Sequence, residues 1–257
     1  EDLPGASFAG EHETYLNVVG QKNVFHAVKM AMASLWNDRA ISYRVDKGFD
    51  HFNVALSVGV QKMVRSDKGS SGVMFTIDTE SGFKNVVEID ASWGLGEMVV
   101  QGKVTPDSYL IFKPTLNQDF PAIIKKSIGS KKNKMIYAST SGAQVNPVKE
   151  VRVAKKDRGI FVLNKDEILA LSRWALEIEK HYTERAGKEM PMDMEWAKDG
   201  ITNELFIVQA RPETVQSEKK HNSITEYSLA TQEKPIVTGI AVGAKIAAGK
   251  TRIITDV

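Results

Sequence analysis

The chain has 257 residues, and its 34 Lys and Arg against 32 Asp and Glu give a formal charge of +2. This length predicts one or two domains, and 42% hydrophobic with 26% charged residues excludes disorder of the bulk. The balanced charge argues against nucleic acid as a partner. The absence of Cys excludes disulfides, thiolate metal sites and Cys nucleophiles.

No stretch approaches the ~20 apolar residues that a bilayer requires, and no signal peptide is visible, so we expect a cytoplasmic location and no membrane contact. The ends are unusual, because the chain opens on Glu1 rather than Met and closes on a strand-like run. We therefore expect a piece of a longer protein.

Apolar residues at helical spacing predict a helix from residue 20 to 35, and Asn37 and Gly48 mark the ends of a second one. Strand-like runs follow, and a basic loop divides the run over 121–138. Asn164 and Glu167 form a capping-box pattern for a helix over 164–182. Residues 139–162 show no clear hydrophobic periodicity, so we assign no element there. The predicted strands are 54–64, 72–77, 86–91, 109–113, 121–138, 192–197 and 204–210. This mixture predicts an α+β fold.

The segments MDMEW and IVQARPET carry the most informative polar residues. Side chains two apart share a strand face, and Asp199-Gly200 between the two runs predicts a hairpin. If that hairpin is centred near Thr202, residue 193 pairs with 211 and residue 195 with 209, and a bulge would shift this register. One face then carries Asp193, Glu195, Gln209 and Arg211. Carboxylate and amide oxygens suit Mg²⁺, and an Arg left free beside them suits a polyphosphate. A surface hairpin with a cross-strand Asp–Arg pair explains the same residues.

Seven segments in unbroken order, covering essentially the whole chain, resemble the nucleotide-binding domain of the phosphoenolpyruvate synthase (pyruvate, water dikinase) family. They are EDLPGASFAGEHETYLNV, SLWNDRAISYRV, VQKMVRSDKGSSGVMFTIDTESGF, ASWGLGEMVVQGKVTPDSY, IGSKKNKMIY, MDMEWAKDG and IVQARPETV. Pyruvate, phosphate dikinase and rifampin phosphotransferase are similar through the Asp-x-Glu and Gln-x-Arg elements.

The resemblance implies an ATP-grasp domain over 1–215 that is incomplete at its amino end. It implies a linker over 216–234 and the start of a phosphohistidine swivelling domain over 235–257. The five His stand outside the Thr-x-His-Ala setting of the family's phosphorylated histidine; they are His12, His26, His51, His181 and His221. The family's Arg-Ser-Ser motif, upstream subdomain and pyruvate-binding barrel are absent here.

By match of motif, Asp193, Glu195 and Gln209 would hold Mg²⁺ and position the ATP phosphates. Arg211 would neutralise charge on the transferred group, which is the catalytic role, and would contact ATP. Such positioning and charge stabilisation suffice for phosphoryl transfer.

Four weaker matches implicate further ATP-binding residues. Glu97 in GLGE would meet the ribose, although Gly clusters usually mark turns. Gln61, Met63 and Val64 would contact adenine, although a core strand is an equal alternative. In the loop 7–10, Gly10 would approach the phosphates, and Thr14 would add a hydroxyl unless it is a plain strand Thr.

The resemblance implies conversion of pyruvate, ATP and water to phosphoenolpyruvate, AMP and phosphate through a phosphohistidine outside this chain. The partners would be ATP and the remaining domains of the same polypeptide, with a homodimer left open. The 257 residues alone would bind Mg·ATP weakly or not at all and would not turn over. A related phosphotransferase with another acceptor, or a non-catalytic nucleotide-binding domain, remains an alternative.

Other basic residues are predicted to be structural. Arg39 and Arg44 are expected in salt bridges on a helix surface. The Lys cluster over 125–134 lacks interleaved aromatic residues and is expected at a solvated hairpin tip rather than on nucleic acid.

Overall fold

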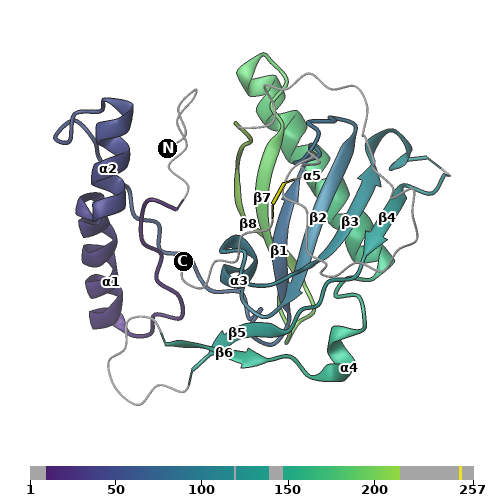
Figure 1. The fold of residues 1–257 in the computed structure, drawn as a ribbon, viewed down its shortest axis with the longest axis horizontal. Helices are drawn as coiled ribbons and strands as arrows, with labels where there is room; N and C mark the ends of the chain where they lie inside the picture. The colour runs from purple at the N-terminus through teal and green to yellow at the C-terminus, as the bar shows by residue number, and fades with distance from the viewer. Residues whose placement is uncertain (1–9, 119, 139–146, 215–248, 251–257) are drawn as a thin grey trace.

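The computed structural model describes residues 10–118, 120–138, 147–214 and 249–250, and its elements are mixed helices and strands (Figure 1). The linker and phosphohistidine segment predicted over 216–234 and 235–257 lie almost wholly outside these residues. The helices are α1 (Gln21–Ala33), η1 (Ser34–Trp36), α2 (Asp38–Lys47), α3 (Glu97–Val100), η2 (Lys113–Thr115), α4 (Lys155–Arg158) and α5 (Lys165–Ala186). The strands are β1 (Ser70–Phe75), β2 (Val86–Trp93), β3 (Asp107–Phe112), β4 (Ile123–Ser127), β5 (Asn133–Tyr137), β6 (Val148–Arg152), β7 (Met192–Lys198) and β8 (Leu205–Pro212).

Six strands form one antiparallel sheet in the order β4-β3-β2-β1-β7-β8, and β5 pairs with β6 in a separate ribbon. In Figure 1, α5 lies behind the sheet and α3 in front of it. The helix pair α1–α2 stands apart from the sheet in the same view. Among the described helices, none combines the length and hydropathy of a membrane span.

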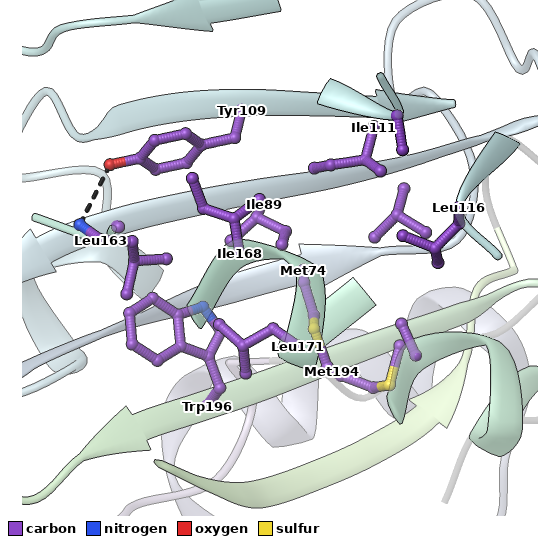
Figure 2. Close-up of a cluster of buried hydrophobic side chains, with 14 of the residues drawn as sticks. Met74, Ile89, Tyr109, Ile111, Leu116, Leu163, Ile168, Leu171, Met194 and Trp196 are labelled. Carbon is purple, nitrogen blue, oxygen red and sulfur yellow. Dashed lines mark hydrogen bonds between the residues drawn. The ribbon is translucent and has the colours of Figure 1, made fainter. Parts of the chain in front are cut away.

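The core lies between α5 and the sheet (Figure 2). Met74, Met194 and Trp196 project from adjacent strands onto Ile168 and Leu171 of α5, and at most 1% of each of these residues is exposed. Burying each such side chain contributes about 1.5–3 kcal/mol. Packing against α5 therefore stabilises the sheet through one face, and the other face can carry polar residues without loss of this core.

The predicted start and end of α2 and the predicted start of α5 are confirmed. Asn37 accepts a hydrogen bond from the Ala40 N–H (2.7 Å), and Gly48 closes α2 in the left-handed conformation. Asn164 and Glu167 form the capping box of α5. This helix continues to Ala186, four residues beyond the prediction, because no glycine or proline interrupts the chain before Gly187.

The strand predicted over 54–64 is wrong, because these residues have no strand pairing in the described part of the chain. Alternating apolar residues satisfy a strand pattern, but a strand forms only where a neighbouring strand accepts its hydrogen bonds. The unassigned stretch contains β6 and α4.

The basic loop is not a hairpin tip, because β4 and β5 belong to different sheets. Lys131 is fully buried and pairs with the equally buried Asp107. The Asp107 carboxylate also accepts hydrogen bonds from the Gly129 and Val162 N–H groups, each at 2.8 Å. The Asp107–Lys131 pair thus connects β3 to the basic loop and to the segment just before α5.

The prediction for Arg39 and Arg44 is half confirmed. Arg39 forms an exposed ion pair with Glu13 (3.0 Å). Arg44 is only 1% exposed and donates to the Leu35 carbonyl (2.5 Å) and to His51 Nδ1 (2.9 Å), so it is not a surface residue. Its guanidinium carries five donors, which lets it satisfy backbone acceptors inside the helix pair.

Candidate functional site

Four polar residues of β7 and β8 lie on the sheet face opposite α5, which we call the open face: Asp193, Glu195, Gln209 and Arg211. Met192, Met194 and Trp196 of β7 are buried in the core, so strand alternation turns Asp193 and Glu195 to the open face. The structure confirms the predicted pairing of residue 193 with 211 and of 195 with 209. The register shifts directly after Glu195, so the alignment holds at the site and changes beyond it.

Arg211 pairs with Asp193 across these strands. Its Nε and Nη2 both donate to Asp193 Oδ2, at 2.9 and 2.6 Å. The two side chains are 32% and 16% exposed, so the pair is partly desolvated. The guanidinium is therefore held in place at the site, and an anion reaching it would have to share it with Asp193.

Glu195 has a different environment, although it is the next residue on the same face. Desolvation raises the pKa of the Glu195 carboxyl, the negative charge of Asp193 raises it further, and Arg211 opposes the change. No hydrogen bond joins its side chain to any residue within the described ranges. A half-buried carboxylate with acidic neighbours is stabilised in its charged form by a cation, so this position suits a metal ion.

Glu97 brings a third acidic side chain close to this pair. It begins α3, and its charge adds to the rise in the Glu195 pKa. The preceding Gly94 has φ +85°, and a Cβ there would lie 2.5 Å from the Met135 carbonyl oxygen. Only glycine fits this turn, which directs α3 over the open face.

The segment that contains Gln61, Met63 and Val64 runs beside the β7–β8 hairpin. Gln61 Nε2 donates to the Val208 carbonyl (3.4 Å), next to Gln209 on β8. The Arg65 carbonyl accepts from the Gly200 N–H (3.1 Å) at the hairpin turn. Met63 and Val64 are half-buried. The structure thus brings this segment to the hairpin without making it a strand.

The loop with Gly10 and Thr14 makes its described contacts with α2 rather than with the sheet. The Glu11 carbonyl accepts from Asn37 Nδ2 (3.0 Å), and Glu13 pairs with Arg39. Gly10 has φ +77° with open space around its Cα, and Thr14 is exposed. Both stay predictions as phosphate contacts, and residues 7–9 lie outside the described part.

Sequence reasoning missed two acidic residues of β2. Val73 pairs with Asp90 on one side and with Glu195 on the other, and Phe75 pairs likewise with Glu88 and Asp193. Glu88 and Asp90 therefore share the open face with the β7 carboxylates. The alternation in VVEIDA, with Val87, Ile89 and Ala91 in the core, was the signal for them.

Burial raises the pKa of Glu88 to about 7 and that of Asp90 to about 6. Thr79 partly opposes the change by donating to Glu88 from its N–H (3.1 Å) and hydroxyl (2.8 Å). No ion pair links either carboxyl to a described basic residue. The part of the open face formed by β2 and β7 is therefore acidic, and Arg211 pairs with Asp193 at its β8 side.

No group of three or more His, Asp or Glu converges into a ready-made metal site within the described ranges. This geometry still suits Mg²⁺, because Mg²⁺ usually takes one or two carboxylates and completes its shell with water and substrate phosphates. A nucleotide would therefore supply the missing ligands.

Comparison with known proteins assigns the class. The chain belongs to the family described as "Pyruvate phosphate dikinase, AMP/ATP-binding domain", whose model matches residues 1–231. The open-face carboxylates and Arg211 thus lie in a nucleotide-binding domain.

Proteins similar to this chain include phosphoenolpyruvate synthases from several bacteria. The one from Aquifex aeolicus is 59% identical over 261 residues, and the one from Escherichia coli is 55% identical over 259 residues. The one from Helicobacter pylori is 52% identical over 262 residues. Each match covers 100% of this chain and 30–32% of the relative, so the chain spans about a third of these relatives' length.

Proposed function

We propose that the chain is the ATP-binding part of a phosphoenolpyruvate synthase. The full protein would convert pyruvate, ATP and water to phosphoenolpyruvate, AMP and phosphate through a phosphohistidine outside these residues. The observation that carries the proposal is the open-face group of Asp193, Glu195, Gln209 and Arg211, found in a chain 50–59% identical over essentially its full length to bacterial phosphoenolpyruvate synthases.

We further infer that the domain has the ATP-grasp architecture, with the open face as one wall of the ATP site. A layer of helix behind an antiparallel sheet whose other face carries the acidic residues supports this assignment. The adenine would lie toward residues 61–64, which run beside β8, and the ribose toward Glu97 at the start of α3.

Mg²⁺, when bound, would supply positive charge that links the carboxylates to the phosphates. Glu195 is the first candidate ligand, since its described surroundings provide no cation except the Arg211 that Asp193 already holds. Asp193 and the Gln209 amide oxygen are the neighbours that would complete the protein's share.

Arg211 would act on the transferred phosphoryl group. Its two hydrogen bonds to Asp193 fix the direction of the guanidinium before ATP arrives, so little reorganisation is needed when charge develops. A planar fork can serve a carboxylate and a phosphate together, which an ammonium group does less well.

Activity of the full-length protein tests this function. With pyruvate, ATP and Mg²⁺, we expect AMP and inorganic phosphate to form together with phosphoenolpyruvate. Arg211→Lys should lower kcat by about 10²–10³-fold. Arg185→Lys, at an exposed position near the end of α5, should leave kcat unchanged. ATP consumption that depends on an acceptor other than pyruvate would assign the related phosphotransferase activity, and wild-type turnover by Arg211→Lys would remove Arg211 from catalysis.

A further inference from the structure

A groove of about 810 Å³ lies on the α5 side of the sheet, away from the open face. It separates α5 from β4, the edge strand. Its described lining is Leu116, Gln118, Phe120, Pro121, Ala122, Ile123, Ile124, Lys125, Lys126, Lys165, Leu169 and Arg173.

The groove exists because one helix cannot cover six strands. A helix is about 10 Å wide and strands are spaced about 4.8 Å apart, so one helix is much narrower than a six-stranded sheet. α5 packs on β2, β7 and β8. In the part of the chain that the structure describes, no second helix lies over the β4 end of the sheet (Figure 1).

Much of the groove lining is apolar. Phe120 is 67% exposed and Ile124 is 52% exposed, while Ile123 and Leu169 are half-buried. Adjacent exposed apolar side chains of this size mark an interaction surface more often than single ones do.

The groove is also basic. Four of the described lining residues are cations and none is a carboxylate, with Asp119 outside the described ranges. Lys165 and Arg173 lie on α5 and form no ion pair with a described residue. Lys126 Nζ lies 4.6 Å from the centre of the Phe161 ring. The charge therefore complements an acidic partner.

The edge of β4 itself is protected from strand addition. Its register with β3 shifts between Leu110 and Ile111, and it carries Lys125 and Lys126 in succession. Bulges and edge lysines are the usual protection against an added strand. A partner therefore has the groove, rather than the strand edge, as its binding surface, and a helix fits between α5 and β4 as a second member of the same layer.

We propose that this groove docks an acidic amphipathic helix from another part of the same polypeptide. Its apolar stripe would contact Phe120, Ile124 and Leu169, and flanking Asp or Glu would pair with Lys165 and Arg173. The curated relatives are about three times as long as this chain, so most of each relative's polypeptide lies outside the matched region. The proposal depends on the length of those relatives and not on the nucleotide chemistry.

Hydrogen–deuterium exchange on the full-length protein tests the docking. We expect Lys165→Glu with Arg173→Glu to raise the exchange rate of backbone amides over 120–126 by roughly tenfold, and 0.5 M salt to act in the same direction. The double reversal Arg185→Glu with Lys188→Glu is the matched control, because both residues are exposed near the other end of α5. Unchanged exchange in β7 reports that the fold is intact.

Carboxyl-to-amine crosslinking of the wild-type full-length protein identifies the occupant. A crosslink from Lys165 to Asp or Glu outside these 257 residues, within one copy, supports the proposal. Crosslinks only between isotopically distinct copies would assign the groove to a homodimer and overturn it. Equal exchange in the reversed variant and the control would also overturn it. ATP turnover is not measured, so the result is independent of the proposed function.

Discussion

The two faces of the six-stranded sheet are built from the same strands and have opposite character. On β7, Met194 and Trp196 are at most 1% exposed against α5, whereas Asp193 and Glu195 between them face away. One face forms the packed core, and the other carries a group of acidic side chains beside Arg211. Substitutions at neighbouring positions of β7 should therefore have different effects: those on the covered face should lower stability, and those on the open face should alter ligand binding.

The largest effect should come from the covered face. Trp196→Ala removes a side chain of the core, so we expect about 3–5 kcal/mol of destabilisation in urea unfolding. Ile201→Ala, at a site 58% exposed, is the control and should change stability by less than about 0.5 kcal/mol. A loss below 1 kcal/mol for Trp196→Ala would mean that α5 does not hold this face.

Lys131→Met should follow with a loss of about 3 kcal/mol, because it leaves the Asp107 charge buried and unpaired. Adding Asp107→Asn removes that charge, so the double variant should be less destabilised than Lys131→Met alone. Denaturant unfolding of both variants measures the difference. Equal losses would show that the hydrogen bonds of Asp107, rather than its charge, dominate.

The raised pKa of Glu88 on the open face should make the free energy of unfolding depend on pH. Because burial raises the pKa of Glu88 to about 7 from the ordinary 4.5, the folded state keeps a proton that the unfolded state loses. Unfolding then releases a proton between those two values, so stability falls as pH rises through that window. The fall should be on the order of 1–3 kcal/mol.

Glu88→Gln should flatten this profile and be more stable than the wild type at pH 8. The control is Glu204→Gln, an exposed residue after the β7–β8 turn, which should keep the wild-type slope. Urea unfolding at several pH values gives both slopes. Parallel profiles for Glu88→Gln and the wild type would place the titration elsewhere.

The smallest effect lies at the start of α5. Asn164→Ala removes the side-chain acceptor of the capping box, and we expect about 1 kcal/mol of destabilisation. Asn117→Ala, at an exposed position outside any helix, serves as a comparison for Asn removal alone. A neutral Asn164→Ala would show that packing of Ile168 and Leu171 alone fixes where α5 begins.

Local sequence patterns predicted those structural features that depend on residues close together in the sequence. Asn164 and Glu167 predict the start of α5, and Asp199-Gly200 predicts a hairpin between β7 and β8, and the structure confirms both. These features follow from short-range hydrogen bonding. The pairing of residue 193 with 211 required the further assumption that the hairpin is centred near Thr202.

Features that depend on distant partners could not be predicted in this way. Residues 54–64 have a strand pattern, but pairing is decided by other segments. Lys131 stands in a run of basic residues, and only the placement of Asp107 explains its burial. Glu88 joins the site because β1 lies between β2 and β7, which is a property of the topology.

Binding of ATP to the full-length protein tests the central claim most directly. Titration calorimetry with and without Mg²⁺ should show that Glu195→Gln weakens Mg·ATP binding at least about tenfold and reduces its dependence on Mg²⁺. Glu204→Gln should bind as the wild type does. Wild-type affinity and Mg²⁺ dependence in Glu195→Gln would contradict the assignment of the open face as the nucleotide and metal site.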